Sequence, residues 1–291
     1  MQDDSTALHN MAGDRDATSQ ASETVMDPTL DPAVEPGAPY PPAVSDQEAI
    51  EATQDLGAFS APKPPPHVDV DLAVPYIHQL WDTPDAFDGH WACGATCSTM
   101  VLAYYGLLEP HPITVKVPFS HTSKYGWYLS NAFDHNGKTL SATADSPSGM
   151  TPGIYGTVLD NVSGIGWVAV WNLHQKGIKP LMDIFLPGIG NKATIVAPTP
   201  PDQIHPDQIK KTLDSGHPVI MAGLPFGYHH IMVVRGYYQD QGGIHWIMND
   251  PYSYRTRGKT YDGGDVVYEW DEIKPRWAVL FSGKTVPKQN P

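Results

Sequence analysis

The chain lacks the features that mark membrane proteins, nucleic-acid-binding proteins and disulfide-stapled folds. Its 291 residues contain no run near the roughly 18 apolar residues that a membrane-spanning helix requires. Only 18 lysines and arginines stand against 32 aspartates and glutamates, so no basic surface for a nucleic acid is expected. The two cysteines, Cys93 and Cys97, are too close along one predicted helix to form a good disulfide. We therefore predict a soluble protein with no membrane span and no nucleic-acid partner.

A secretory start is also missing. The first residues, Met1–Ser5, carry neither the basic charge nor the apolar stretch of a signal peptide. The sequence therefore gives no support for export, unless a signal has been removed or the protein is released by cell lysis. It leaves the cellular location and the redox compartment open.

The first 66 residues differ in composition from the rest of the chain. They hold twelve acidic residues, two basic residues and ten prolines, with few aromatic or large aliphatic side chains. Such a segment buries too little apolar surface to offset the entropy that ordering costs. We predict a disordered acidic segment over 1–66 and a folded domain over 67–291, in which 16 basic residues nearly balance 20 acidic ones.

A helix that carries a cysteine in its first turn is the clearest local prediction. From Cys93 onward, apolar side chains at Cys97, Met100 and Tyr104 share one stripe, and Gly106 is suited to end the helix. A thiol at a helix N-terminus gains from the partial positive charge and the free N–H groups there, which stabilise a thiolate. The pattern favours Cys93 as a nucleophile and Cys97 as a core residue beneath it.

The remaining elements are clear only near the two ends of the folded part. Residues 68–77 have the pattern of an extended segment, and 107–200 form an insertion in which only a short helix-like piece near Tyr155–Val162 stands out. After residue 200 the pattern predicts one short amphipathic helix and four strands, the second and third of them joined as a hairpin. These are Asp207–Asp214, Pro218–Leu224, His230–Tyr238, Gly243–Met248 and Trp277–Ser282.

The hairpin brings a base and a carboxylate to one end of the predicted sheet. His230 begins one strand and Asp250 follows the neighbouring antiparallel strand, so the two side chains are expected to meet. An imidazole can activate the Cys93 thiol, and a carboxylate can fix the imidazole tautomer. Gln79 can act as an oxyanion-hole donor beside the backbone N–H of Cys93, because an amide donates without titrating.

Five ordered motifs resemble those of cysteine peptidase family thirty-nine and its relatives, papain-like enzymes that include bacteriocin leader-processing peptidases. The motifs are Val74–Gln79, Cys93–Thr96, Gly216–Ile220, His230 with Gly236–Tyr237, and Asn249–Pro251. The resemblance covers about 72–106 and 205–282. It implies an α+β papain-like fold in which the helix bearing the nucleophile packs on an antiparallel sheet. It also implies Cys93 as nucleophile, His230 as general base and acid, Asp250 as orienting residue and Gln79 in the oxyanion hole.

Several structural alternatives remain at these positions. Cys93 could be an inert core thiol. His229 could replace His230 as the base, and Asn249 could replace Asp250 as the orienting residue. The remaining polar residues of this region are read as structural rather than metal-binding, because neither the complete calcium pattern nor a second Cys/His pair for zinc is present. These residues are Asp82, Asp85, Asp88 and His90.

Four functions fit these residues. The first is a thiol hydrolase that cuts a peptide or isopeptide bond, either a processing protease or a peptidoglycan endopeptidase or amidase of the kind that phage lysins use. The second is a transglutaminase-like or peptidyltransferase enzyme with the same three residues. The others are a non-catalytic peptidase-like binding module and an interaction protein that acts through its acidic segment. We expect a monomer without metal or cofactor whose substrate is a peptide or a peptidoglycan stem peptide.

Overall fold

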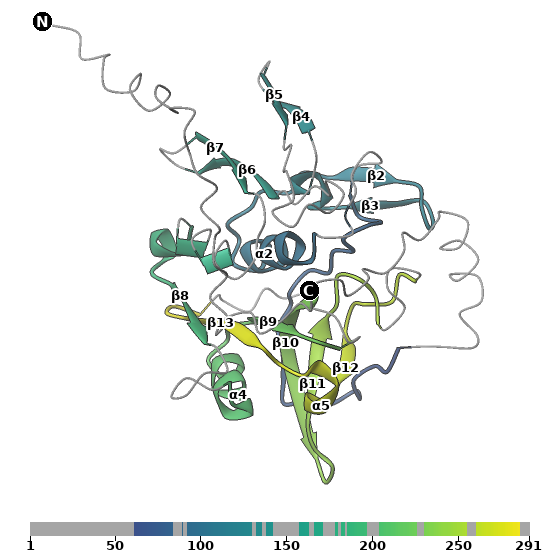
Figure 1. The fold of residues 1–291 in the computed structure, drawn as a ribbon, viewed down its shortest axis with the longest axis vertical. Coiled ribbons are helices and arrows are strands. Elements are labelled where there is room, and N and C mark those ends of the chain that lie inside the picture. Colours follow the sequence, from purple (N-terminus) through teal and green to yellow (C-terminus); the bar gives the residue numbers. More distant parts are fainter. Residues whose placement is uncertain are drawn as a thin grey trace, which may run out of the picture.

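An antiparallel β-sheet forms the centre of the structure, with its strands in the order β12-β11-β10-β9-β13-β8 (Figure 1). Strand β1 pairs with β10 beyond the residues that β9 covers, which makes seven strands. The computed structural model describes residues 61–83, 89, 92–129, 132–135, 138–141, 157–162, 166–170, 178–179, 182–183, 185–196, 204–225, 230–254 and 260–285.

The strands of this sheet are short except for the central hairpin. They are β1 (Val70–Asp71), β8 (Lys192–Val196), β9 (Val219–Gly223), β10 (His230–Asp240), β11 (Gly243–Asn249), β12 (Val266–Tyr268) and β13 (Trp277–Ser282). Three separate two-stranded sheets lie between α2 and β8 in the chain. They consist of β2 (Ile113–Val115) with β3 (His121–Ser123), β4 (Ala132–His135) with β5 (Lys138–Ser141), and β6 (Thr157–Val162) with β7 (Gly166–Val170).

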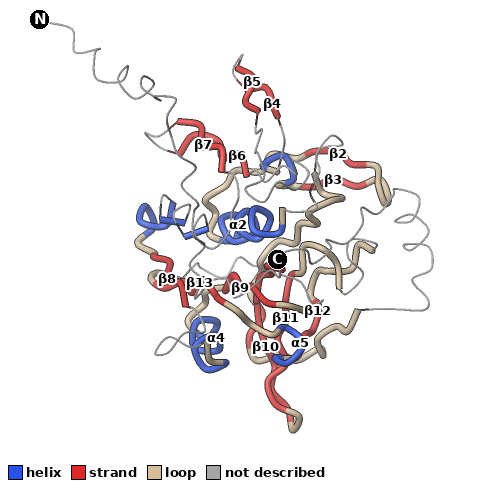
Figure 2. Tube along the Cα trace, viewed as in Figure 1, coloured by secondary structure: helices blue, strands red, loops and turns tan. Residues whose placement is uncertain are grey.

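Helices cover both faces of the central sheet (Figure 2). They are α2 (Cys93–Tyr104), α4 (Pro206–Asp214) and α5 (Trp270–Ile273), together with the 3-10 turns η1 (Gly126–Tyr128) and η2 (Leu186–Ile189). Successive residues of a strand point to opposite faces, so Ile231 and Val233 pack with α2, while Met232 and Val234 pack with α4 and α5. The sheet is therefore buried on both sides in this region, and a helix packed on an antiparallel sheet agrees with the predicted α+β class.

Helix α2 follows the sequence prediction closely. It begins at Cys93 and ends at Tyr104, and Gly106 has a φ of +68°, the left-handed conformation that ends a helix with least strain when the residue is glycine. Most of its residues are buried, so the helix lies in the core rather than on the surface. Packing against β9 and β10 fixes the position of its N-terminus relative to the sheet.

The hairpin and the last strand are also confirmed. Strands β10 and β11 pair in antiparallel register from Val233 with Asn249 to Asp240 with Gly243, so a tight turn joins them. Strand β13 has the predicted bounds, and α4 differs from its predicted range by one residue.

Other local predictions were wrong or incomplete. The piece near Tyr155–Val162 was predicted to be helix-like, but its described part, Thr157–Val162, forms strand β6, since pairing with β7 decides its conformation. The segment predicted as extended over 68–77 pairs as a strand only at Val70–Asp71. Strand β8, which lies within the stretch read as an insertion, pairs with β13 and belongs to the central sheet.

Residues 61–63 pack on the edge of the sheet, although the sequence assigned them to the acidic segment. Ala61 is buried in the core cluster that contains β12. The Pro62 carbonyl accepts a hydrogen bond from the Val267 N–H at 2.9 Å, and the Lys63 ammonium donates to the Gly264 carbonyl. This strap covers edge strand β12, so the packed domain begins at or before Ala61. Residues 1–60 lie outside the described part.

Two deletions are expected to separate the strap from the acidic segment. Removing residues 1–60 should change the melting temperature little, because their composition offers few buried contacts. Removing residues 1–69 should lower it by several degrees, since loss of the Ala61, Pro62 and Lys63 contacts costs on the order of 2 kcal/mol. Differential scanning calorimetry of the two truncated chains measures this. Equal melting temperatures would show that the strap contributes no stability.

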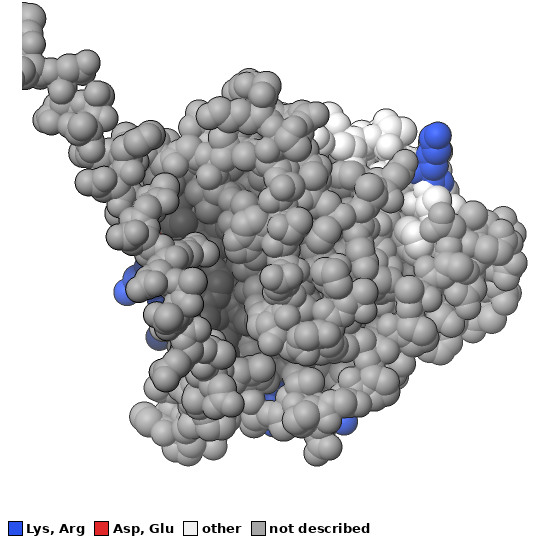
Figure 3. Space-filling view, turned by 45° about the horizontal axis from the view of Figure 1, so that its top comes forward, with Lys and Arg blue, Asp and Glu red and all other residues white. Residues whose placement is uncertain are grey.

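The described helices are short, and the described Lys and Arg side chains visible in Figure 3 are scattered. None of the helices in the described ranges is long and apolar enough to cross a bilayer. On the face in Figure 3, the visible Lys and Arg side chains of the described part stand at separate points.

Candidate active site

Cys93 occupies the first position of α2, where the initial backbone N–H groups have no partner within the helix. Its side chain is partly exposed. Cys97, one turn later, is fully buried and its thiol donates to the Ile231 carbonyl at 3.3 Å. Burial raises the pKa of the Cys97 thiol well above its usual value. Cys97 is therefore the core residue that the sequence predicted, and Cys93 is the accessible one.

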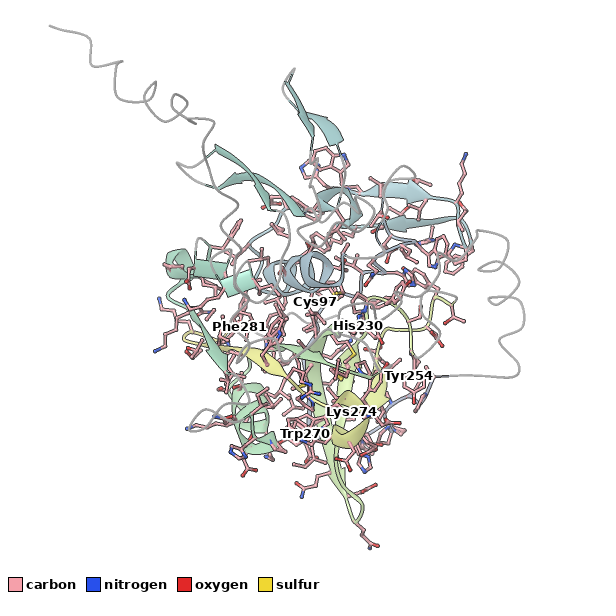
Figure 4. All side chains as sticks on the ribbon, viewed as in Figure 1. Cys97, His230, Tyr254, Trp270, Lys274 and Phe281 are labelled. Carbon is pink, nitrogen blue, oxygen red and sulfur yellow. The ribbon has the colours of Figure 1, made fainter. Side chains whose placement is uncertain are left out.

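His230 lies at the start of β10 and faces both Cys93 and Asp250. Its Nε2 donates to Asp250 Oδ1 at 2.7 Å, and a further side-chain hydrogen bond joins its ring to Cys93. Because Nε2 is engaged with the carboxylate, Nδ1 is the nitrogen left for the thiol. Figure 4 shows Cys97 and His230 in the layer between α2 and the sheet. The predicted Cys, His and Asp residues are thus brought together from α2, β10 and the end of β11.

The charge state of His230 is set by its surroundings. Burial alone lowers the pKa of the imidazole, but the charge of Asp250 and the hydrogen bonds to Asp250 and Cys93 raise it to about 10. The ring therefore carries a proton at neutral pH. An imidazolium beside a cysteine favours the thiolate form of that cysteine.

Asp250 is fully buried, and both of its carboxylate oxygens are hydrogen-bonded. Oδ1 accepts from His230 and from the Tyr252 N–H at 2.8 Å. Oδ2 accepts from the Tyr268 hydroxyl at 2.7 Å. A buried carboxylate of this kind is held in one orientation by three donors.

The backbone around Asp250 is equally constrained. Its N–H donates to the Gly263 carbonyl at 2.8 Å, and its own carbonyl accepts from the Tyr76 hydroxyl at 3.2 Å. A Cβ at position 263 would come within 2.0 Å of the Asp250 carbonyl oxygen, so only glycine fits this approach. No sequence pattern singled out Tyr76, Gly263 or Tyr268 for a place at this site. Tyr268 gave only the signal of a short Val-Val-Tyr strand, which does not distinguish it from core residues.

Asn249 does not orient the histidine in this structure. Its amide nitrogen donates to the carbonyls of Val74 at 3.1 Å and Pro75 at 3.4 Å, and its oxygen accepts from the Asp265 N–H at 3.3 Å. Alternation along β11 sends its side chain away from Asp250. The geometry thus favours Asp250 over Asn249 as the partner of His230.

Gln79 lies between the segment that follows Asp250 and the turn that leads into α2. Its backbone N–H donates to the Pro251 carbonyl at 2.8 Å, and its side-chain nitrogen donates to the Gly89 carbonyl at 2.7 Å. Gly89 in turn accepts from the Ala92 N–H at 2.9 Å, immediately before Cys93. The side chain of Gln79 is buried, and its amide is held near the start of α2.

A buried carboxylate, Asp82, joins three segments next to this site. Its Oδ2 accepts from the His78 N–H at 2.6 Å and from the Tyr261 hydroxyl at 2.7 Å, while Oδ1 lies 2.7 Å from His121 Nε2. The hydrogen bond to Asp82 raises the pKa of His121. Asp82 therefore links the 76–83 segment, β3 and the loop after Asp250 through its hydrogen bonds. This agrees with the structural role expected for Asp82 from the sequence.

His78 is buried in its neutral form beside Asp82. Its Nδ1 accepts from the backbone N–H groups of Leu80 and Trp81, each at 3.1 Å, so the ring proton is assigned to Nε2, which bonds Ser253 Oγ at 2.9 Å. Burial lowers the pKa of His78 to about 4. A protonated ring would lose both bonds at Nδ1.

Acidification is expected to weaken the fold through His78. Its folded-state pKa of about 4 lies below the usual 6.5, so the unfolded chain gains a proton as the pH falls through 6.5 while the folded chain does not. Stability then falls between pH 6.5 and 4 by about 3 kcal/mol. Urea unfolding over this range should show a flatter dependence for His78→Asn, whose amide oxygen can replace the Nδ1 acceptor. An unchanged dependence would assign the effect to other groups.

Some predicted positions lie outside the described residues. These are His229, Asp85, Asp88 and His90. Among the described residues, no group of three or more His, Cys, Asp or Glu side chains is arranged to hold a metal ion. The described geometry brings a cysteine, a histidine and a carboxylate into contact, with an amide nearby.

Comparison with protein families gives a match over most of the folded part. The model of the peptidase C39 like family matches residues 71–278, from β1 into β13. The chain belongs to the peptidase C39 like family. This confirms the relationship that the five motifs indicated, and it relates the chain to cysteine peptidases with a peptide substrate. A comparison with curated proteins found no match.

The family match includes every residue of the candidate site. Cys93, His230, Asp250 and Gln79 all lie within 71–278, whereas the acidic segment over 1–66 lies outside it. The match spans α2 and the hairpin of β10 and β11, the elements that carry these side chains. Family membership and site geometry therefore concern the same part of the chain.

Proposed function

We propose that this protein is a thiol hydrolase that cleaves a peptide or isopeptide bond through an acyl-enzyme, with Cys93 as nucleophile. The observation that carries the proposal is the placement of His230. Its Nε2 bonds Asp250, and a second hydrogen bond joins the imidazole ring to the Cys93 side chain. A carboxylate stabilises the protonated form of this buried histidine, and the histidine contacts a cysteine at the N-terminus of a helix. This arrangement activates a thiol.

The reaction follows from this arrangement in two halves. In the first, the Cys93 thiolate attacks the scissile carbonyl carbon, and the His230 imidazolium gives its proton to the leaving amine as the C–N bond breaks. A thioester with Cys93 remains. In the second, a water molecule attacks the thioester and gives one proton to His230. The C–S bond then breaks to re-form the thiolate, and the carboxylic acid product leaves and loses its remaining proton to solvent. Asp250 keeps the ring oriented and stabilises its positive charge throughout.

The oxyanion that forms in each half of the reaction requires hydrogen-bond donors. The backbone N–H of Cys93 lies at the start of α2, where helix N–H groups lack partners within the helix. The amide of Gln79 is held near the same point by its bond to the Gly89 carbonyl. We assign both groups to the oxyanion hole, where each donor contributes to stabilising the tetrahedral intermediate.

The substrate is proposed to be a peptide, either a precursor that is processed or the stem peptide of peptidoglycan. An acyl transferase would use the same three residues and differ only in whether an amine or water resolves the thioester. Both candidates predict an acyl group on Cys93, so trapping of this intermediate separates an enzyme from a binding module.

The test is incubation of the full chain with a peptide library and, separately, with purified peptidoglycan, read by mass spectrometry. New amino and carboxyl termini are expected, together with a transient mass added to the peptide that contains Cys93. Products that carry an added amine, such as glycine methyl ester supplied in excess, would instead identify an acyl transferase. Absence of both products and adduct with every substrate would overturn the proposal.

A further inference from the structure

We propose that Tyr268 is a positioning residue of this site, one that fixes the Asp250 carboxylate in the orientation that His230 requires. This inference rests on the proposed function. The Tyr268 hydroxyl donates to Asp250 Oδ2 at 2.7 Å, on the oxygen opposite the one that His230 uses. The histidine and the tyrosine therefore hold the two oxygens of one carboxylate.

The carboxylate needs this second anchor because its own torsion is soft. The last torsion of an aspartate side chain is broad and roughly two-fold, so the side chain alone does not fix the plane of the carboxylate. Oδ1 is fixed by His230 and the Tyr252 N–H. Tyr268 donates to Oδ2, and its loss would leave a fully buried anionic oxygen without that donor.

Tyr268 is itself held rigidly. It ends β12, where it pairs with Trp246 of β11, and its ring lies 5.0 Å from the ring of Tyr254. The side chain is fully buried. On the other edge of β12, the Val267 N–H bonds the Pro62 carbonyl of the N-terminal strap. The hydroxyl is thus placed by the sheet and the strap.

The consequence lies in the charge balance of His230. The pKa of this ring is raised because a correctly oriented Asp250 opposes the cost of burying its charge. If the carboxylate turns to find another donor for Oδ2, its bond to Nε2 weakens and the pKa of His230 falls toward its usual value. The base would then be misplaced and less charged when the leaving amine requires a proton.

The test is Tyr268→Phe in the full chain, which removes the hydroxyl and keeps the ring. We expect kcat to fall roughly 10- to 100-fold while KM stays within about twofold, since the substrate-binding groups are unchanged. We also expect the pKa of His230, followed by NMR of its ring, to fall by at least about half a unit. The titration needs no turnover, so it tests the role of Tyr268 even if the proposed activity fails.

A matched control is available on strand β10. Tyr237 also donates its hydroxyl to a carboxylate, Asp214 Oδ1 at the end of α4, at 2.6 Å, and it lies seven residues along β10 from His230. Tyr237→Phe therefore loses an equivalent bond and should leave kcat and the pKa of His230 unchanged. A double-mutant cycle with Asp250→Asn should show that Tyr268→Phe has little further effect once the carboxylate is gone.

Two results would overturn the inference. In one, Tyr268→Phe has the same kcat and the same His230 titration as Tyr237→Phe. In the other, Tyr268→Phe and Asp250→Asn are additive in kcat, which would mean that Tyr268 acts on the fold and not through Asp250. Should Tyr268→Phe not fold, Tyr268→His is used with the same two readouts. Because its ring N–H can still donate, kcat and the pKa of His230 should stay near the wild-type values, and a loss as large as that of Asp250→Asn would overturn the inference.

Discussion

Cys93→Ala is expected to abolish turnover while leaving the melting temperature almost unchanged. The loss should exceed about ten-thousand-fold, because the acyl-enzyme cannot form without the sulfur. Little stability is lost because the Cys93 side chain is partly exposed and lies at the first position of α2 rather than in the buried middle of the helix. Initial rates of peptide cleavage, normalised to folded protein, provide the measurement.

Cys97→Ala is the matched control on the same helix. Cys97 is buried and bonds the Ile231 carbonyl, so its removal should cost about 1 kcal/mol of stability and leave turnover per folded molecule nearly unchanged. In the wild-type chain, iodoacetamide at about pH 6 to 7 should label Cys93 and spare Cys97, whose pKa is raised by burial. Preferential labelling of Cys97, or full activity of Cys93→Ala, would contradict the assignment.

Asp250→Asn is expected to preserve the fold and to reduce turnover by about a thousand- to ten-thousand-fold. A neutral amide neither stabilises the imidazolium nor selects the same ring tautomer. The pKa of His230, raised to about 10 chiefly by this carboxylate against the effect of burial, should fall. The measurement is a pH profile of kcat, in which activity is lost as the pH rises through the pKa of His230.

The direction in which the pKa of His230 is shifted determines where the pH profile falls. Because His230 is charged below its raised pKa, the alkaline limb of the wild type should lie well above 6.5 and move to lower pH in Asp250→Asn. A wild-type profile with a single rising limb near the pKa of a free thiol, about 8.5, would mean that His230 does not activate Cys93.

Asn249→Ala gives the contrasting variant one residue earlier. Its buried amide bonds the Val74 carbonyl and the Asp265 N–H, so its loss should lower the melting temperature and affect the chemistry less than Asp250→Asn. If Asn249→Ala removed activity at unchanged stability while Asp250→Asn were nearly silent, Asn249 would be the residue that orients His230.

The sequence by itself determined the elements whose signals are local. The stripe of apolar residues and the glycine at 106 were enough for α2, and the turn before Gly243 was enough for the hairpin of β10 and β11. Because an antiparallel hairpin places the start of one strand beside the end of the next, it also brought His230 and Asp250 together. The ordered motifs indicated the family, which the match over 71–278 confirmed.

Only the tertiary structure decided the contacts that join distant parts of the chain. The Tyr268 hydroxyl on Asp250, the pairing of β8 with β13 and the strap of residues 61–63 on β12 follow from strand register and packing, which no short window of sequence encodes. For the same reason Thr157–Val162 is a strand despite its helix-like pattern, since pairing with β7 outweighs a weak local preference. Local periodicity fixes elements, whereas the partners of buried polar groups are fixed when those elements pack.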